Sequence, residues 1–244
     1  MQLKNSRKGI YILPNLFTTA ALFAGFYAIV QAMNGQFDYA AIAIFIAMIL
    51  DGLDGRVARW THTESDFGAQ YDSLSDMVSF GLAPSLVIYE WALSGLGNFG
   101  WLAAFLYAAC AALRLARFNI QTGSSDGRYF TGLPSPSAAA LIAGLVWVLH
   151  TTGVPGKEVS FIALGITIFA ALSMVSNIRY HSFKHLNIKD RVSFPVVIEV
   201  VLLFVLIALY PPQALFILFL GYAVSGPLFA SFRLYQRRIS SRRT

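Results

Sequence analysis

The 244-residue sequence has little charge and almost no cysteine. Lys, Arg, Asp and Glu make up 12% of the residues, about half of what an average soluble domain carries. The single cysteine, Cys110, excludes a fold held together by disulfide bonds within the chain. Hydrophobic residues make up 57% and the mean hydropathy is +0.61, which excludes a disordered or collagen-like chain. The composition therefore indicates a membrane protein.

Eight apolar stretches approach the length of about 20 residues that a helix needs to cross a bilayer. They cover residues 12–33, 39–60, 69–93, 99–119, 135–151, 159–178, 193–210 and 213–235. The sequence therefore predicts an all-α fold, a polytopic membrane helix bundle with about eight transmembrane helices. Residues 1–9 are polar and no small-residue cleavage site ends the first stretch, so we expect no cleaved signal. We expect residues 1–244 to form a single membrane domain.

Basic residues gather on one side of this arrangement. The loops after the first, third and seventh stretches hold no Lys or Arg, and the loop after the fifth holds only Lys157. The other 17 of the 18 basic residues fall in or beside the remaining loops and the two chain ends. Because positive charge marks the cytoplasmic side, we expect both termini at the cytoplasmic face of the inner (plasma) membrane. The net charge of +6 is then an orientation signal, and we expect no nucleic-acid partner.

Four aspartates lie at the cytoplasmic ends of the second and third stretches. Asp51 and Asp54 are three residues apart, and Asp72 and Asp76 are four apart, so each pair shares a helix face. A short loop joins the two helices, which must pack antiparallel, so the pairs can face each other. Converging carboxylates repel and are costly to desolvate unless a cation neutralises them. The alternative is that the aspartates only solvate a loop. That explanation would be sufficient for any single aspartate, but it does not account for four of them at helical spacing.

Oxygen ligands of this kind favour Mg²⁺ or Mn²⁺. Mg²⁺ is characteristically coordinated by substrate phosphates as well as by protein carboxylates. The neighbouring residues suit such a phosphate. Gly55 and Ala58 remove side-chain bulk, and Arg59 can bind phosphate oxygens with two hydrogen bonds. A cation transporter is the alternative from a different class. Transport predicts an inverted repeat and polar residues across the membrane midplane, and the sequence has no visible repeat.

The pattern Asp51-x2-Asp54-Gly55-x2-Ala58-Arg59-x8-Gly68-x3-Asp72-x3-Asp76 resembles the signature of the CDP-alcohol phosphatidyltransferase family at every fixed position. The resemblance implies a six-helix catalytic core with two metal ions, Mg²⁺ or Mn²⁺, here at residues 10–178. Residues 192–235 would then form two additional helices. The implied metal ligands are Asp51, Asp54, Asp72 and Asp76, and Asp76 would also act as the general base. The implied contacts to CDP-diacylglycerol are Asn15, Gly55, Ala58, Arg59, Ser65 and Gly68.

Two further segments resemble the phosphatidylserine synthase branch of that family. They are Arg114-Leu-Ala-Arg117-Phe118-Asn119 and Phe130-Thr-Gly132-Leu133-Pro134-Ser135-Pro136. A serine acceptor is a zwitterion, so its carboxylate needs a cation. The candidate serine-binding residues are Arg114, Arg117, Asn119 and Arg128. The alternatives are that the two arginines of the first segment are ordinary cytoplasmic anchors, and that Ser135 only caps the following helix.

The resemblance implies transfer of a phosphatidyl group from CDP-diacylglycerol to L-serine at the cytoplasmic face, giving phosphatidylserine and CMP. The alternative within the same chemistry is another alcohol such as glycerol 3-phosphate, whose phosphate would demand more cationic groups. The expected partners are the two substrates and the lipid bilayer. The resemblance also favours a homodimer.

Overall fold

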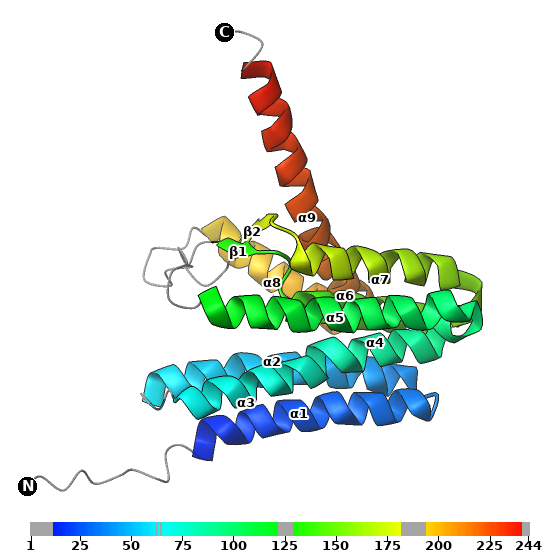
Figure 1. The fold of residues 1–244 in the computed structure, drawn as a ribbon, viewed down its shortest axis with the longest axis horizontal. Helices are drawn as coiled ribbons and strands as arrows, with labels where there is room; N and C mark the ends of the chain where they lie inside the picture. Colours follow the sequence, from blue (N-terminus) through cyan, green and yellow to red (C-terminus); the bar gives the residue numbers. More distant parts are fainter. Residues whose placement is uncertain (1–11, 62, 64, 122–128, 182–193, 241–244) are drawn as a thin grey trace, which may run out of the picture.

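The computed structural model describes residues 12–61, 63, 65–121, 129–181 and 194–240, which form a bundle of helices with one short ribbon of two strands (Figure 1). The long helices are α1 (Ile12–Met33), α2 (Phe37–Thr61), α5 (Asn98–Gln121), α6 (Ser135–Thr151), α7 (Ser160–Val175), α8 (Phe194–Leu209) and α9 (Pro211–Ser240). Between α2 and α5 one continuous helix contains α3 (Asp66–Asp76), η1 (Met77–Leu82), α4 (Ala83–Ile88), η2 (Tyr89–Leu93) and η3 (Ser94–Leu96). A short turn, η4 (Gly156–Val159), leads into α7.

The predicted all-α polytopic membrane bundle is confirmed. Five helices in the described part of the chain are long and apolar enough to cross a membrane: α1, the continuous helix 66–96, α5, α7 with η4, and α9. Helix α2 is as long as these, but Asp38, Asp51 and Asp54 interrupt its apolar length. Helices α6 and α8 are shorter and apolar. Together with the long continuous helix, these elements match the eight predicted stretches, with ends that differ by a few residues.

Small residues bring α1 against the helix that contains α3 and η1. Ser75 Oγ donates to the carbonyl of Thr18 at 3.1 Å, and Ser79 Oγ donates to the carbonyl of Ala21 at 3.0 Å. Gly25 lies opposite Ser79, and a Cβ added at Gly25 would lie 2.5 Å from Ser79 Oγ. The two helix axes can therefore approach closely only because residue 25 has no side chain.

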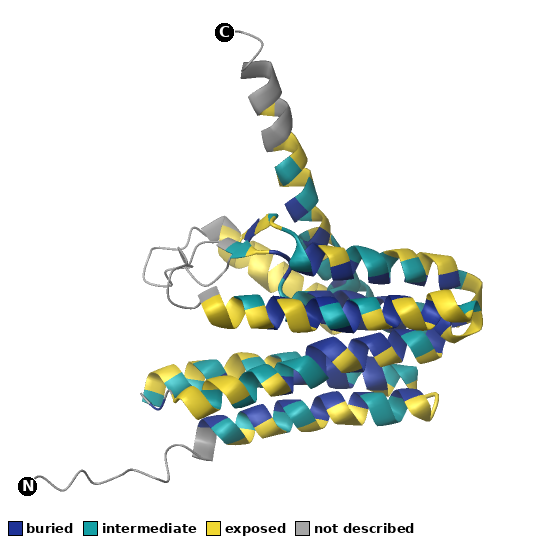
Figure 2. Cartoon of the chain, in the orientation of Figure 1, coloured by how far each residue is buried: buried dark blue, intermediate teal, exposed yellow. Residues whose placement is uncertain are grey.

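The interior of the bundle lies around α4, α5 and α6, where Figure 2 shows buried residues along the inner sides of α4 and α5. Most of the buried core residues are alanines and medium-sized aliphatic side chains. Tyr107 is fully buried, and its hydroxyl donates to the carbonyl of Phe80 at 3.2 Å, which ties α5 to η1. The outer face of α1 instead exposes Leu16, Phe23 and Phe26. This distribution suits helices that pack on one side and contact lipid on the other.

An antiparallel ribbon, which the sequence does not predict, closes one end of the bundle. Strand β1 (Tyr129–Thr131) pairs with β2 (Arg179–His181), and Phe130 faces Tyr180 in the register. Gly132 follows β1 with φ of +80°, and a Cβ there would lie 2.2 Å from the carbonyl oxygen of Met174. Only glycine therefore fits this turn. The ribbon directs the chain from β1 straight into α6.

The last two helices lie differently from the others. Side chains from Val196 to Leu209 on α8 are exposed on nearly all sides of the helix. Helix α9 packs on α6, where a Cβ at Gly144 would lie 3.1 Å from Cα of Phe216. Its second half projects away from the bundle, across the direction of α5 and α7 (Figure 1).

Candidate metal and substrate site

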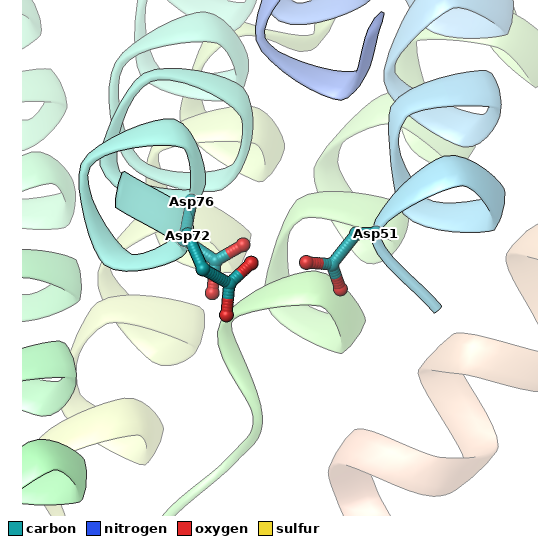
Figure 3. A group of neighbouring side chains, drawn as sticks. All are labelled: Asp51, Asp72 and Asp76. Atoms are coloured by element: carbon teal, nitrogen blue, oxygen red, sulfur yellow. The ribbon is translucent and has the colours of Figure 1, made fainter. Parts of the chain in front are cut away.

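Three carboxylates meet between α2 and α3. Asp51 extends from α2, and Asp72 and Asp76 extend from one face of α3 toward it (Figure 3). One carboxylate oxygen from each lies within 4.8 Å of the others, and all three residues are partly buried. Asp51 therefore lies opposite Asp72 and Asp76, as the spacing predicts, whereas the expected partner of Asp51 in its pair, Asp54, is not part of this group. The cluster could hold a metal ion.

The chemistry of these oxygens fits a hard divalent cation. Asp72 Oδ1 is buried and has no hydrogen-bond partner among the described residues. Three carboxylates this close together repel each other strongly in a partly buried setting. A cation among them would satisfy the buried oxygen and offset the repulsion at the same time. The residues present therefore fit the metal that the sequence pattern implies.

The fourth aspartate lies apart from this group. Asp54 is only 5% exposed, and its Oδ2 accepts a hydrogen bond from Thr18 Oγ1 at 2.7 Å. Thr18 Oγ1 also lies 3.2 Å from the carbonyl of Pro14, one turn earlier on α1. Asp54 therefore faces α1, whereas Asp51 faces α3.

Local structure at both ends of α3 sets the direction of its two aspartates. Ser65 caps the first turn, since its Oγ accepts a hydrogen bond from the Gly68 backbone N–H at 3.1 Å. The last residue of α3 is Asp76, and the wider π-turn η1 begins directly after it at Met77. Such π-turns are frequently found at functional sites. On this helix Asp72 and Asp76 face α2, while Ser75, before the turn, and Ser79, within it, face α1.

The residues expected to contact the nucleotide substrate fall into two groups. A Cβ at Gly68 would lie 3.1 Å from Ser65 Oγ and 3.7 Å from Asn15 Oδ1, so these three residues adjoin each other at the start of α3. On α2, a Cβ at Gly55 would lie 3.4 Å from Nη1 of Arg59, whose exposed side chain folds back over the glycine. Ala58 is partly buried on the same last turns of α2.

Arg114 is a candidate acceptor residue that interacts electrostatically with one carboxylate of the cluster. It is 9% exposed, and its Nη1 donates to Ser135 Oγ at 2.7 Å. Its guanidinium also lies over the ring of Phe118, 5.9 Å from the centroid, and interacts electrostatically with Asp76. Its Nε has no hydrogen-bond partner among the described residues. Ser135 therefore holds the arginine instead of capping α6, whose N-cap is Pro134.

The other expected acceptor residues lie elsewhere. Arg117 donates from Nη1 to the carbonyl of Ser176 and to Asn177 Oδ1, both at 3.4 Å, toward the end of α7. Asn119 exchanges hydrogen bonds with Ser73, which joins α5 to α3 next to Asp72. Arg128 lies outside the described residues. The structure thus brings Arg114 to the carboxylates and gives Arg117 and Asn119 contacts that connect helices.

Sequence reasoning missed two residues of this region. Nothing in the spacing of Thr18 identifies Asp54 as its partner 36 residues away. Tyr222 on α9 lies near Arg114, although Tyr222 is 108 residues further along the chain. Its place in the sequence gives no signal of this proximity.

Comparisons with known proteins agree with this geometry. A family model described as CDP-alcohol phosphatidyltransferase matches residues 11–175. The protein named CDP-diacylglycerol--serine O-phosphatidyltransferase from Helicobacter pylori (strain J99) is 40% identical over 196 residues, which cover 80% of this chain and 83% of that protein. A protein of the same name from Mycobacterium tuberculosis (strain H37Rv) is 43% identical over 147 residues, 57% of this chain and 51% of the relative. The archaetidylserine synthase of Methanothermobacter thermautotrophicus is 36% identical over 171 residues, 69% of each chain. This chain belongs to the CDP-alcohol phosphatidyltransferase family.

Proposed function

We propose that this protein transfers a phosphatidyl group from CDP-diacylglycerol to L-serine, giving phosphatidylserine and CMP. The observation that supports the chemistry most directly is the convergence of Asp51, Asp72 and Asp76 within 4.8 Å at the end of a membrane bundle. The names of the relatives from Helicobacter pylori and Mycobacterium tuberculosis support serine as the acceptor. The buried arginine beside Asp76 supplies a cation for the carboxylate of serine.

Two divalent cations, Mg²⁺ or Mn²⁺, complete the proposed site. Asp51, Asp72 and Asp76 would hold them. Asp54, which is hydrogen-bonded to Thr18, is the proposed fourth ligand by family resemblance. When bound, the cations would neutralise the negative charge that develops on the diphosphate as CMP leaves. The unpartnered Asp72 Oδ1 supports this assignment, because a buried carboxylate oxygen without a donor is costly.

The proposed base is Asp76. Its carboxylate accepts the proton of the serine hydroxyl as the serine oxygen forms a bond to the phosphorus that carries the diacylglycerol. The bond from that phosphorus to the oxygen of the departing CMP breaks on the opposite side. The electrostatic interaction of Arg114 with Asp76 supports this role, because a serine held by its carboxylate at Arg114 would have its hydroxyl in the neighbourhood of the base.

The nucleotide end of the donor would lie against the two groups formed by the starts of α1 and α3 and the last turns of α2. Arg59 would bind phosphate oxygens as a charged donor, and Gly55 adds no side-chain bulk beside its guanidinium. Asn15, Ser65 and Gly68 would contact the cytidine side. The diacylglycerol part would remain in the bilayer, along the exposed apolar faces of the helices.

The proposed setting is the inner (plasma) membrane, with both termini and the site at the cytoplasmic face. The distribution of basic residues along the chain supports this orientation. We also propose that residues 1–244 act as a single membrane domain and that two copies form a homodimer, which light scattering of the detergent-solubilised protein would test. A monomeric mass would contradict the dimer without affecting the reaction.

The deciding experiment uses the full chain, purified in detergent, with CDP-diacylglycerol, Mn²⁺ or Mg²⁺, and labelled serine. We expect labelled phosphatidylserine and an equal amount of CMP, and we expect EDTA to stop both. Parallel reactions contain glycerol 3-phosphate in place of serine. Formation of labelled lipid from glycerol 3-phosphate but not from serine would overturn the acceptor and keep the chemistry. Absence of CMP with every acceptor would overturn the proposed reaction.

A further inference from the structure

Helix α9 lies beyond residues 11–175, the part of the chain that the family model matches, and yet it connects to the region around Arg114. The connection runs through the ribbon of β1 and β2, which stands between α9 and the start of α6. Two contacts between β2 and α9 make this connection.

The first contact places a tyrosine of β2 in a notch of α9. Tyr180 is 1% exposed, and its hydroxyl donates to the carbonyl of Ala223 at 3.1 Å. In a regular helix that carbonyl would accept the N–H of residue 227, but Pro227 has no N–H. Gly226 makes the space for the ring, because a Cβ there would lie 2.4 Å from Cζ of Tyr180. Gly226 and Pro227 thus create both the space and the free acceptor that Tyr180 uses.

The second contact runs in the opposite direction. Tyr222 on α9 donates from its hydroxyl to the carbonyl of His181 on β2 at 3.1 Å. The rings of Tyr180 and Tyr222 lie side by side, with centroids 5.6 Å apart. Each element therefore donates one tyrosine hydroxyl to a backbone carbonyl of the other. We call this pair of tyrosines, with its two hydrogen bonds, the tyrosine latch.

The ribbon connects the tyrosine latch to Arg114 through a series of contacts. Phe130 of β1 pairs with Tyr180 of β2. The residues after β1 are fastened to the chain before β2, since Gly132 N–H donates to the carbonyl of Ile178 at 2.8 Å. Three residues later Ser135 Oγ accepts the hydrogen bond from Arg114. The tyrosine latch, the ribbon and Ser135 thus form one continuous set of contacts that ends at the guanidinium.

We propose that Tyr180 and Tyr222 are positioning residues that hold Arg114 at the angle needed to bind the carboxylate of the acceptor. Arg114 retains an Nε donor without a partner among the described residues, buried next to Asp76, which suits a carboxylate ligand. The acceptor specificity of the enzyme then depends on α9, outside the matched family segment. This inference rests on the proposed function, because it assigns the acceptor of that same reaction to Arg114.

The test compares the full-length variants Tyr180→Phe, Tyr222→Phe and the double variant with wild type in detergent. Each single change removes one hydroxyl, and we expect the KM for serine to rise roughly five-fold, the ratio that corresponds to one hydrogen bond. We expect an unchanged KM for CDP-diacylglycerol. The double variant is expected to raise the KM for serine by less than the product of the two single effects. The two hydrogen bonds belong to the same contact between β2 and α9, so their effects are not independent.

Pro227→Ala tests the latch without altering either tyrosine. Alanine restores an N–H that competes with Tyr180 for the Ala223 carbonyl, so we expect the KM for serine to rise in the same direction. Tyr210→Phe and Gly221→Ala are the matched controls near and on α9, since Tyr210 is exposed and a Cβ at Gly221 meets nothing within 4 Å. Both controls are expected to behave as wild type.

A serine KM within two-fold of wild type in all latch variants would overturn the inference alone. Equal increases in both KM values, or a lower yield of folded protein with unchanged KM values, would also overturn it, because these results indicate a purely structural role. Failure of the wild-type protein to transfer serine would overturn the proposed function, and this inference with it.

Discussion

The neutral side chain of Thr18 orients the buried carboxylate of Asp54 through a hydrogen bond. Its Oγ1 donates to Asp54 Oδ2 at 2.7 Å, and Asp54 is almost completely buried. Hydrogen bonds to charged groups contribute about 1.5–3 kcal/mol, and most of that is lost when only the donor is removed. The orientation of Asp54, and with it any contribution to metal binding, therefore depends on a residue of α1.

We expect Thr18→Val to lower the free energy of unfolding by about 2 kcal/mol, because it leaves the Asp54 carboxylate without its side-chain donor. We also expect it to weaken Mn²⁺ binding about ten-fold, a typical effect for residues that orient a ligand. Thermal unfolding in detergent and electron paramagnetic resonance of free Mn²⁺ measure the two effects. Thr18→Ser, which keeps the hydroxyl, and Thr19→Val, on the exposed neighbour, serve as controls. Equal behaviour of all three variants would contradict the role of Thr18.

Asp76 carries two proposed roles, so its replacement has two distinct readouts. We expect Asp76→Asn to lower kcat by at least about 10³-fold, because both the proton acceptor and a metal ligand are lost. In EDTA the variant should unfold at an equal or higher temperature than wild type, since one repelling carboxylate is gone from the cluster. The increase in unfolding temperature that Mn²⁺ produces should become smaller. Retained turnover would exclude Asp76 as the base.

At the scale of elements, the spacing of α1 from the helix of α3 and η1 depends on Gly25. A Cβ at this position would lie 2.5 Å from Ser79 Oγ and 2.7 Å from Ser79 Cα. We expect Gly25→Ala to destabilise the protein by about 1–3 kcal/mol and to reduce activity, because a contact with backbone cannot be relieved by rotating a side chain. Thermal unfolding and the serine-transfer assay measure these effects.

Gly165→Ala on α7 is the matched control, because a Cβ there meets nothing within 4 Å. Alanine favours a helix by about 1 kcal/mol over glycine, so the control should be as stable as wild type or more stable. Comparable losses of stability and activity in Gly25→Ala and Gly165→Ala would show that the close contact at Gly25 is not the cause of the losses.

The sequence predicts the helices and the carboxylate cluster because both follow from local periodicity. Asp72 and Asp76 share a face through their spacing of four, and a short connection between α2 and α3 brings Asp51 opposite them. The ribbon was missed, because strands of three residues leave no periodic signal and pair over some 50 residues of chain. The Thr18–Asp54 bond and the notch at Gly226 are contacts of tertiary packing, which no spacing along the chain reveals.

At the scale of the whole molecule, orientation in the membrane is directly measurable. The only native cysteine, Cys110, is buried, so a Cys110→Ser background leaves no competing thiol. We expect Asn34→Cys, in the turn between α1 and α2, to react with an impermeant maleimide in intact cells. Phe67→Cys, at the exposed start of α3, should react only after the membrane is opened. The reverse pattern would place the termini and the site on the outer side.

The exposed apolar face of α1 has a consequence for how the reaction rate should be expressed. Leu16, Phe23 and Phe26 face outward on the same helix whose other side holds Thr18 against Asp54. A lipid donor whose acyl chains lie against this apolar face would arrive by lateral diffusion, without leaving the bilayer. The concentration that governs turnover is then two-dimensional, the mole fraction of donor in the membrane or micelle. Added neutral detergent at constant total donor should slow the enzyme, although the donor concentration per unit volume of solution is unchanged.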